Sequence, residues 1–278
     1  MWSDDVKPFL KWAGNKYRIV DRIRGLLPAG VRLIEPFAGS AAVFLNTDYK
    51  ENIVNDVNTD LISLYVVLKT HGLSFIDECK GLFQADTNSP EAYYNLRDEF
   101  NQVLDPVRKA ALFLYLNRHG YNGLCRYNRD GQFNVPFGRY KQPYFPFEEM
   151  MMFYHKSQDT EFTSEDFESV MSRAKPGDVV YCDPPYVPLS PTSNFTEYSA
   201  GGFGPKEQLR LAELAKALSG RGISVLLSNH HNDFTLQAYS SAQITSFDVQ
   251  RFISSDAANR RKATELLAFF PGQPQSVV

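Results

Sequence analysis

Two short apolar runs near the start of the chain, each followed by a helical pattern, constrain its fold most strongly. Residues 32–36 and 52–55 have the length and composition of buried strands. A helical pattern opens near Ser40 after the first run, and a longer one covers 59–70 after the second. Strands that alternate with helices in this way form a parallel sheet with helices packed against it. The opening of the chain therefore predicts an α/β fold.

The same order returns in the last third of the chain. Strands are predicted over 179–182 and 224–227, with a helix over 205–218 between them. The segments 243–250 and 264–270 have the pattern of a closing hairpin. We therefore expect a doubly wound, mostly parallel, Rossmann-like sheet built from both ends of the chain.

The middle of the chain differs in composition. It begins with several helical patterns, and 119–146 is then rich in Gly, Asn, Arg and aromatic residues. Arg129-Asp130-Gly131 is a turn signal between two short β-prone runs. We therefore expect 1–70 and 160–278 to form one α/β domain, interrupted by a helical and β-hairpin insertion over 71–159.

The charge distribution makes this insertion a candidate polyanion-binding surface. The chain has 278 residues and a net charge of −3, but residues 106–146 carry seven basic side chains and a single acid, Asp130. A basic segment on an otherwise acidic protein is typical of a nucleic-acid site. The alternative is a solvated loop whose charges are paired elsewhere.

Other compositional features favour a protein of the cytosol. No apolar run is long enough for a membrane span, and the first residues lack the pattern of a signal peptide. The three cysteines are far apart in the sequence, which predicts neither a disulfide framework nor a zinc cluster. The histidines have no ligand spacing, so no metal site is expected.

A tetrad at the end of a predicted buried strand carries the most specific chemistry. Asp183-Pro184-Pro185-Tyr186 directly follows the apolar run 178–182. A carboxylate and a nearby carbonyl can accept hydrogen bonds from an amino group on a planar ring and localise its lone pair. The prolines stiffen the turn and have no N–H. The tyrosine offers a flat face on which an extruded base can stack. The alternative is a strand end with a proline turn.

The turn after the first strand, residues 35–41, predicts a nucleoside-binding site. Its small residues, Gly39 among them, let the backbone approach a ligand. Asp56 ends the second strand, where an acid can bind ribose hydroxyls. Sequence motifs for a pyrophosphate or a nucleotide triphosphate are missing, which argues against NAD and ATP. Near the N-terminus, Trp12 and Lys16 stand before a helix start that can receive a carboxylate.

Taken together, these motifs resemble the DNA adenine methyltransferase (Dam) family. The resemblance covers nearly the whole chain, and its most specific parts are residues 11–14, 117–127, 134–140 and 183–186. It implies a methyltransferase fold with 71–159 as the target-recognition domain. It also implies methyl transfer from S-adenosylmethionine to the flipped-out adenine of GATC in double-stranded DNA, with S-adenosylhomocysteine as product. Roles in mismatch repair, replication timing or gene regulation are implied by the resemblance alone.

The resemblance assigns roles to individual residues. In the catalytic tetrad, Asp183 and Pro184 would accept hydrogen bonds from the target amino group, Pro185 would stiffen the turn, and Tyr186 would stack on the adenine. The residues implied to bind the cofactor are Trp12, Lys16, Phe37, Gly39, Asp56, Asp166, Phe167 and Asp183. Those implied to read GATC or fill the gap left by the flipped base are Lys11, Tyr121, Asn122, Leu124, Arg126, Pro136 and Tyr140. Phosphate contacts are implied for Arg97, Asn128, Asn134 and Arg139.

Two residues depart from the family pattern. Asn15 stands where glycine is common, and Ala41 replaces the second glycine of Phe-x-Gly-x-Gly. Asparagine tolerates left-handed backbone, so Asn15 is compatible with a tight turn. Ala41 is compatible if its φ is negative. Both departures bear on cofactor affinity more than on reaction type.

Two other functions are compatible with the motifs. One is an RNA or protein-glutamine methyltransferase, since similar tetrads act on other planar amines and amides. The other is a DNA-binding regulator that has lost catalysis. The basic insertion favours duplex DNA over the first, and the intact tetrad argues against the second. For the leading hypothesis we expect a monomer without metal or membrane contact, located in a bacterial-type cytoplasm and associated with the nucleoid through DNA.

Overall fold

The computed structural model describes residues 5–186, 203–249 and 263–273. These residues hold seven strands: β1 (Arg32–Glu35), β2 (Glu51–Asn55), β3 (Thr160–Thr163), β4 (Asp178–Cys182), β5 (Ser224–His230), β6 (Gln243–Val249) and β7 (Ala263–Phe270). The helices of the first half are α1 (Val20–Leu26), α2 (Ala42–Leu45), α3 (Thr59–His71), α4 (Leu73–Gly81), α5 (Pro90–Phe100) and α6 (Pro106–His119). Those of the second half are α7 (Phe147–Lys156), α8 (Phe167–Ser172), α9 (Pro205–Gly220) and α10 (Asp233–Ala238).

The chain forms two compact units. The first unit comprises residues 1–24 and 38–165, and the second comprises 25–37 and 166–278. The division expected from the sequence, with 1–70 and 160–278 as one α/β domain and 71–159 as a recognition insertion, stays a prediction.

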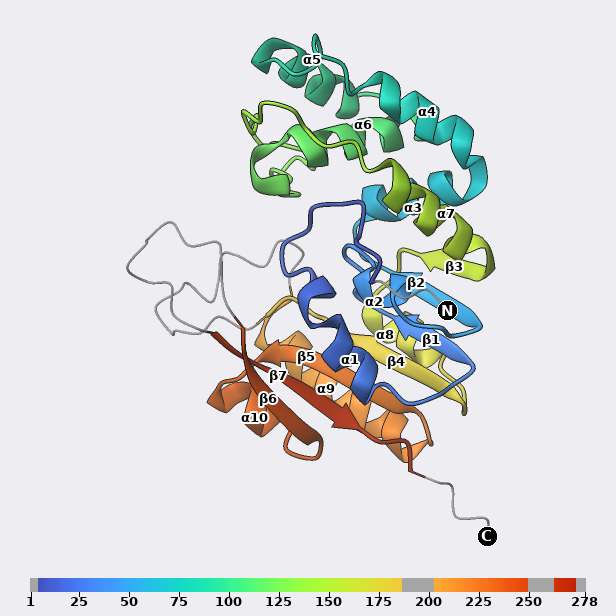
Figure 1. Cartoon of the computed structure of the whole chain (residues 1–278). Helices are drawn as coiled ribbons and strands as arrows, with labels where there is room; N and C mark the ends of the chain where they lie inside the picture. Colours follow the sequence, from blue (N-terminus) through green and yellow to red (C-terminus); the bar gives the residue numbers. More distant parts are fainter. Residues whose placement is uncertain (1–4, 187–202, 250–262, 274–278) are drawn as a thin grey trace. The chain divides into compact units, whose positions relative to one another are not determined.

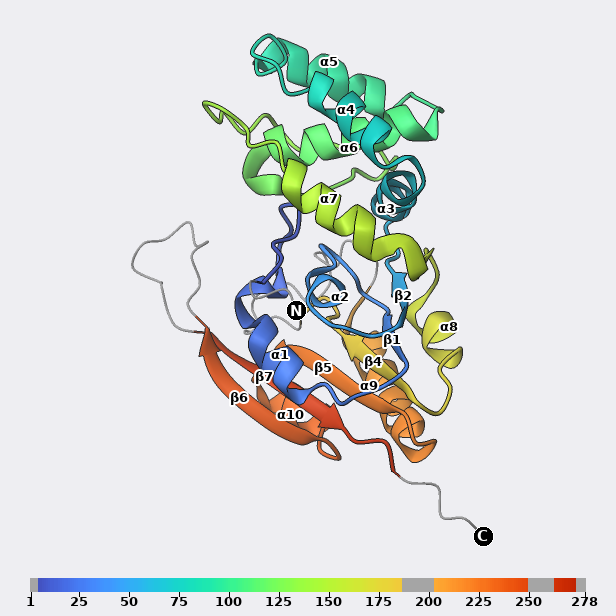
Figure 2. The ribbon, with the colours of Figure 1, turned by 45° about the vertical axis from the view of Figure 1, so that its right-hand side comes forward.

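In the first unit, strands β2 and β3 pair in parallel, and helices α3 to α7 pack on one another. Figures 1 and 2 show these helices gathered around α6. Three of them begin at a side-chain cap: Asn58 accepts from the N–H of Leu61, Ser89 from Ala92, and Asp105 from Arg108. Such caps satisfy backbone donors that the first helical turn leaves unpaired. The helical pattern over 59–70 and the several helical patterns expected after it are therefore confirmed.

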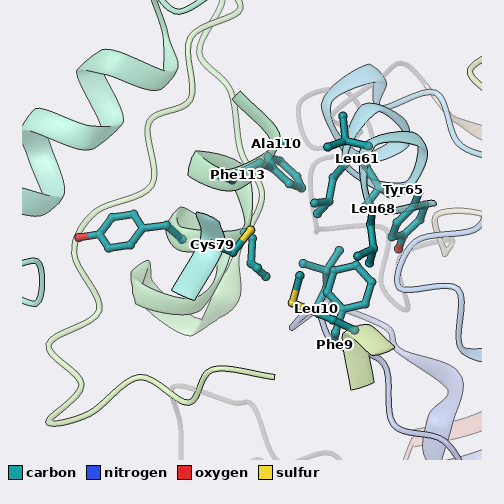
Figure 3. Close-up of a cluster of buried hydrophobic side chains, with 14 of the residues drawn as sticks. Phe9, Leu10, Leu61, Tyr65, Leu68, Cys79, Ala110 and Phe113 are labelled. Carbon is teal, nitrogen blue, oxygen red and sulfur yellow. The ribbon is translucent and has the colours of Figure 1, made fainter. Parts of the chain in front are cut away.

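The core of the first unit forms where the N-terminal segment meets these helices. Phe9 and Leu10 are buried against α3, and Phe9 packs edge-on against Tyr65. Figure 3 shows this cluster of buried side chains, which includes Leu61, Tyr65 and Leu68 of α3, Cys79 of α4, and Ala110 and Phe113 of α6. The burial of Phe9 and Leu10 fixes the residues that follow them, which belong to the candidate site.

In the second unit, five strands lie in the order β1-β4-β5-β7-β6. Strands β1, β4 and β5 are parallel, whereas β7 runs antiparallel to β5 and β6. Helix α9 packs against β5 and β7, and α10 packs against α9 (Figures 1 and 2). An ion pair between Arg32 and Asp178, with 2.6 Å between Nη2 and Oδ2, joins the starts of β1 and β4.

The mostly parallel α/β fold predicted from the sequence is confirmed. The predicted strands and helices in both halves are present, and β6 pairs with β7 as the expected closing hairpin. Residue 250 of that prediction lies outside the described residues. Four elements were not predicted: α7, β3, α8 and α10. None of the described helices is long and apolar enough to span a bilayer.

Candidate active site

The tetrad leaves the carboxyl end of β4, at the centre of the second unit. All five residues of β4 are buried, and the parallel neighbours β1 and β5 flank the strand on both sides. This explains why the run 178–182 is continuously apolar after its first residue. Asp183 follows at an intermediate exposure, Pro184 is buried and Pro185 is exposed. The parallel sheet thus ends at a carboxylate, the position where ligands bind in such folds.

The tyrosine of the tetrad is held on two sides. The Tyr186 hydroxyl donates to Oε2 of Glu265 at 3.2 Å. The ring of His230 lies edge-on to the Tyr186 ring, with 4.5 Å between centroids and 78° between planes. His230 and Glu265 face each other across the β5–β7 pair. Burial, reinforced by the carboxylates of Asp183 and Glu265, raises the pKa of Tyr186 well above its usual value. Its hydroxyl is therefore a neutral donor at physiological pH.

Asp183 influences the groups that precede it. Tyr181 and Cys182 are fully buried, and burial is the largest cause that raises the pKa of each, followed by the Asp183 carboxylate. The Tyr181 hydroxyl also shares a hydrogen bond of 2.7 Å with Ser228 of β5. The strand end thus keeps its own thiol and phenol neutral.

A separate aromatic cluster lies in the second unit near the start of α8. The rings of Phe37 and Phe167 stack at 5.6 Å, and Phe203 contacts both edge-on at 5.3 and 5.5 Å. The Arg210 guanidinium covers the Phe167 ring at 5.2 Å and forms an ion pair of 3.8 Å with Asp166. The structure brings together the predicted Phe37, Asp166 and Phe167 and adds Phe203 and Arg210, which sequence reasoning missed.

In the first unit, the turn after residue 37 is built around Asp56. Its Oδ2 accepts from the N–H of Gly39 at 2.9 Å, and its Oδ1 accepts from the N–H of Asn58 at 3.0 Å. Burial raises the pKa of Asp56 even though both donors act to lower it. Trp12 lies directly over Gly39, because a Cβ added there would be 2.8 Å from the indole Nε1. The predicted Trp12, Gly39 and Asp56 are therefore neighbours.

The two departures from the family pattern behave differently from expectation. Ala41 has a φ of 58°, so the condition of a negative φ is not met, and a fully buried alanine occupies left-handed backbone. Asn15 has a φ of −49° and needs no left-handed tolerance. It caps the following helical turn instead, since its Oδ1 accepts from the N–H of Tyr17 at 2.8 Å. The left-handed residue of that turn is Gly14, with a φ of 77°.

Lys16 is buried, with 6% of its surface exposed, and its Nζ donates to the carbonyl of Gly14 at 2.9 Å. The ammonium therefore folds back over the turn that contains Gly14 and Asn15. This geometry places the Lys16 amino group at the N-terminal side of the first helical turn, and its contact with a cofactor stays a prediction.

Three predicted DNA-reading residues meet on the surface of the first unit. The Lys11 Nζ lies 3.8 Å from the centroid of the Tyr140 ring, and the Tyr140 hydroxyl accepts from the N–H of Asn122 at 3.0 Å. The Lys11 Nζ also donates to the carbonyl of Arg118 at 3.1 Å. Burial, followed by the Arg118 guanidinium, lowers the pKa of Lys11 to about 8. Lys11 thus lies close to its titration point near neutral pH.

The backbone of Lys11 is held by the side chain of Asn117 in α6. The Asn117 Oδ1 accepts from the N–H of Lys11 at 2.9 Å, and its Nδ2 donates to the Lys11 carbonyl at 2.7 Å. Gly123 packs so tightly against the Lys11 side chain that an added Cβ would lie 2.2 Å from the Lys11 Cβ. Contacts of this kind between residues more than 100 positions apart could not be read from the sequence.

The predicted hairpin exists as a short bridged turn. Tyr127 and Phe133 form an antiparallel bridge, and Asn128 closes the turn by donating its N–H to the carbonyl of Gln132 at 2.9 Å. On this hairpin the Arg126 Nε donates to Oδ1 of Asn134 at 2.7 Å. Arg126 and Asn134, two of the residues predicted to contact DNA, are therefore paired with each other. Arg126 is exposed, and so is Asn128 in the turn.

The hairpin is tied to the start of α3 by contacts that sequence reasoning missed. The Tyr127 hydroxyl donates to Oδ2 of Asp60 at 2.7 Å, and Lys109 forms an ion pair of 2.9 Å with Oδ1 of Asp60. The Asn58 Nδ2 donates to the Cys125 sulfur at 3.3 Å. Asn58 also donates its N–H to Asp56, so the predicted cofactor carboxylate and the hairpin predicted to contact DNA both contact the same residue.

The remaining predicted contacts are on the same unit. Arg97 of α5 stacks on Tyr94 at 4.8 Å and donates to the carbonyl of Val135 at 3.4 Å. Arg139 has a φ of 55°. The exposed members of the predicted DNA-contacting set are Tyr121, Asn122, Leu124, Arg126, Asn128, Pro136 and Arg139. Among the described residues, no group of three or more His, Cys, Asp or Glu is arranged to hold a metal ion.

An α/β sheet that ends in Asp-Pro-Pro-Tyr, in a chain with a basic segment over 106–146, is the arrangement expected of an amino-methyltransferase that acts on DNA. Residues 12–253 match the model of the D12 class N6 adenine-specific DNA methyltransferases, and the chain belongs to this family. It is an adenine-specific DNA methyltransferase.

Curated relatives extend over nearly the whole chain. The DNA adenine methylase of Escherichia coli (strain K12) is 50% identical over 267 residues, which are 96% of each chain. That of Serratia marcescens is 50% identical over 265 residues, covering 95% of this chain and 98% of the relative. That of Vibrio cholerae serotype O1 (El Tor Inaba N16961) is 46% identical over 265 residues, covering 95% and 96%.

Similarity to solved structures is weaker. SMU.472, described as a candidate methyltransferase and solved with SAH, aligns with a TM-score of 0.42 and 11% identity, over 96% of this chain and 55% of that one. A precorrin 8W decarboxylase of Methanobacterium thermoautotrophicum aligns with a TM-score of 0.38 and 9% identity, over 93% and 92%. The family assignment does not depend on either likeness.

Proposed function

We propose that this enzyme methylates the adenine of GATC in double-stranded DNA, with S-adenosylmethionine as the methyl donor and S-adenosylhomocysteine as the product. The observation that carries the reaction is the tetrad at the end of β4, where Asp183 stands beside a tyrosine that is kept neutral and fixed at two points. The family supplies adenine as the target.

The tetrad supports a direct transfer. The Asp183 carboxylate and the Pro184 carbonyl accept hydrogen bonds from the adenine amino group, which draws the nitrogen lone pair out of the ring. This nitrogen then bonds to the methyl carbon while the carbon–sulfur bond breaks, and the surplus amino proton leaves to solvent. An extruded adenine stacks on Tyr186 during this step. No covalent enzyme intermediate is needed.

The residues predicted to bind the cofactor fit a sulfonium nucleoside. When bound, this nucleoside supplies an activated methyl group. Asp56 offers a fixed carboxylate for ribose hydroxyls, because two backbone donors set its orientation. The stacked pair of Phe37 and Phe167 offers an aromatic wall for a purine, and Asp166 lies at the start of α8 beside it. The indole of Trp12 and the ammonium of Lys16 complete the proposed set in the first unit.

Specificity for GATC is proposed for the surface that carries Lys11, Asn122 and Tyr140, and for the hairpin that carries Arg126. Arginine and lysine read guanine through its major-groove acceptors, and apolar groups such as Leu124 and Pro136 suit the thymine methyl. We assign Tyr121 and Asn122 to the gap left by the extruded adenine. We assign Arg97, Asn128, Asn134 and Arg139 to phosphate contacts. We further propose that the enzyme acts as a monomer in the cytoplasm and is associated with the nucleoid through the DNA that it binds.

The test uses purified protein, S-adenosylmethionine and two unmethylated duplexes, one with GATC and one with that site scrambled. Each duplex is digested to nucleosides and analysed by mass spectrometry. N6-methyladenine in the GATC duplex alone supports the proposal. Equal methylation of both duplexes would refute GATC specificity. If protein freed of bound small molecules methylates DNA without added S-adenosylmethionine, the proposal that S-adenosylmethionine is the methyl donor is refuted.

A further inference from the structure

A buried polar network lies directly behind the tetrad and takes no part in the reaction described above. Gln208 of α9 donates from its Nε2 to the carbonyl oxygen of Pro185 at 2.6 Å. The Gln208 Oε1 accepts from the Asn229 Nδ2 at 3.0 Å and from the Tyr239 hydroxyl at 3.1 Å. Gln208, Asn229 and Tyr239 are at most 2% exposed. Buried amides of this kind are costly unless every polar atom is paired.

The orientation of this network is fixed by backbone groups at its two ends. The Pro185 carbonyl can only accept, so the amide nitrogen of Gln208 must face it. The Gln208 oxygen then faces the Asn229 Nδ2, and the Asn229 Oδ1 accepts from the N–H of His230 at 2.9 Å, a group that can only donate. Each amide therefore has one allowed orientation, and the two side chains form a rigid link from Pro185 to the end of β5.

The link matters because two of the four tetrad residues have no backbone donor. Pro184 and Pro185 have no N–H, so the turn cannot be stabilised by backbone donors at these positions. The carbonyl that Gln208 holds belongs to the peptide that joins Pro185 to Tyr186. The ring of Tyr186 is fixed at its far end by Glu265 and His230. His230 follows Asn229 directly, so one segment of β5 supports both ends of Tyr186.

We propose that Gln208 is a positioning residue for methyl transfer: through Pro185, and backed by Asn229 and Tyr239, it sets where the base-stacking ring of Tyr186 and the accepting carbonyl of the tetrad lie. This inference rests on the proposed role of the tetrad, but not on GATC as the sequence recognised. Gln208 does not touch the substrate. Its loss therefore slows the transfer step and leaves the binding of cofactor and DNA largely intact.

The experiment compares Gln208→Met with Ser219→Ala. Methionine keeps the length of the side chain and removes its donor and acceptor. Ser219 is a matched control, because it lies at the other end of α9, is also buried, and donates to another proline carbonyl, that of Pro271, at 2.6 Å. Both variants lose one buried hydrogen bond to a carbonyl, but only one of these carbonyls belongs to the tetrad.

The readout is the single-turnover rate of N6-methyladenine formation on long unmethylated DNA, which contains many sequence contexts, at saturating S-adenosylmethionine. Equilibrium binding of cofactor and DNA is measured in parallel. Misplacing reacting groups by about 1 Å costs on the order of 100-fold in rate, so we expect Gln208→Met to be roughly 10- to 100-fold slower. Binding by this variant, and the rate of Ser219→Ala, should stay within about twofold of the unchanged protein.

Two further variants make the result decisive. Tyr239→Phe removes the hydroxyl that donates to the Gln208 oxygen and accepts from the Asn229 Nδ2 at 3.0 Å, but it keeps the Gln208 amide itself. Its rate should therefore fall between those of the unchanged protein and Gln208→Met, and this variant also serves if Gln208→Met does not fold. Asp183→Ala tests the tetrad itself. If Asp183→Ala is inactive while Gln208→Met or Tyr239→Phe transfers methyl as fast as Ser219→Ala, the positioning role of Gln208 is refuted and the proposed role of the tetrad stands. If Asp183→Ala keeps its rate, the proposed tetrad fails and the role of Gln208 fails with it.

Discussion

The left-handed backbone of Ala41 leads to a stability prediction that separates strain from burial. Ala41 has a φ of 58° and no exposed surface. Left-handed conformation costs an L-residue about 1–2 kcal/mol, a cost that glycine does not have. Ala41→Gly removes this strain. It also removes a buried methyl group worth about 0.8 kcal/mol and adds unfolded-state freedom worth about 0.4–1 kcal/mol.

These terms nearly cancel, so Ala41→Gly should change the free energy of unfolding by less than about 1 kcal/mol. Ala111→Gly is the matched control, because Ala111 is equally buried but lies inside α6, where the backbone is right-handed. There glycine costs about 1 kcal/mol in helix propensity and about 0.8 kcal/mol for the methyl group, with no strain to release. The control should therefore lose about 2 kcal/mol.

The assay is urea unfolding of both variants and the unchanged protein, followed by fluorescence and circular dichroism, with the slope m checked for constancy. The difference between the two variants, about 1–2 kcal/mol, measures the strain at Ala41. If Ala41→Gly is destabilised as much as Ala111→Gly, no strain is stored at this position and the reasoning is wrong.

Four further predictions concern the proposed site and its support. Asp183→Ala should abolish N6-methyladenine formation, measured by mass spectrometry, while DNA binding persists. Arg126→Ala should lose about 1–3 kcal/mol of discrimination at one base pair; an equal loss on all sequences would instead identify a phosphate contact. Because the pKa of Lys11 is about 8, its positive charge is lost as pH rises through that value. DNA binding, measured by fluorescence anisotropy at constant salt, should therefore weaken between about pH 7 and 9. DNA binding by Lys11→Arg should weaken far less over the same range. Tyr127→Phe should destabilise the protein by about 1–2 kcal/mol in urea unfolding, since its hydroxyl donates to a carboxylate, whereas Tyr121→Phe, at an exposed position, should not.

The elements predicted correctly have strong local signals. Helix α6 begins with Asp105-Pro106, and β4 is a continuous apolar run before two prolines. The elements that were missed are mostly short: β3 has four residues, and α8 and α10 have six each, too few to show a period. Helix α7 is the exception. Pro146 precedes it, acids occupy its first turn and bases its last, so its start and stop signals were present in the sequence.

Local backbone geometry around Asn15 and Ala41 could not be predicted from residue types. Asparagine is tolerant of left-handed backbone, yet Asn15 is not left-handed, whereas the less tolerant Ala41 is. The difference arises from long-range contacts: Asn15 is needed as a cap, and the turn at Ala41 is set by Gly39, whose N–H is held by Asp56 and whose carbonyl accepts from the Tyr65 hydroxyl at 2.5 Å. Propensity describes what a residue tolerates, and the surrounding contacts decide what it adopts.

The N-terminal motif shows why a sequence pattern can identify a site without revealing how the site is assembled. Lys11 and Trp12 are adjacent, yet the backbone of Lys11 is bound by Asn117 of α6, and Trp12 covers Gly39 in the turn held by Asp56. These two long-range contacts are therefore only one peptide bond apart along the chain. The same holds at the tetrad, where Pro185 accepts from Gln208 and Tyr186 donates to Glu265, residues that lie more than 20 and almost 80 positions further along the chain. A motif search finds the residues proposed to contact the substrate, because their types are dictated by chemistry. The residues that hold them are dictated by geometry, and they become visible only when the hydrogen bonds are traced.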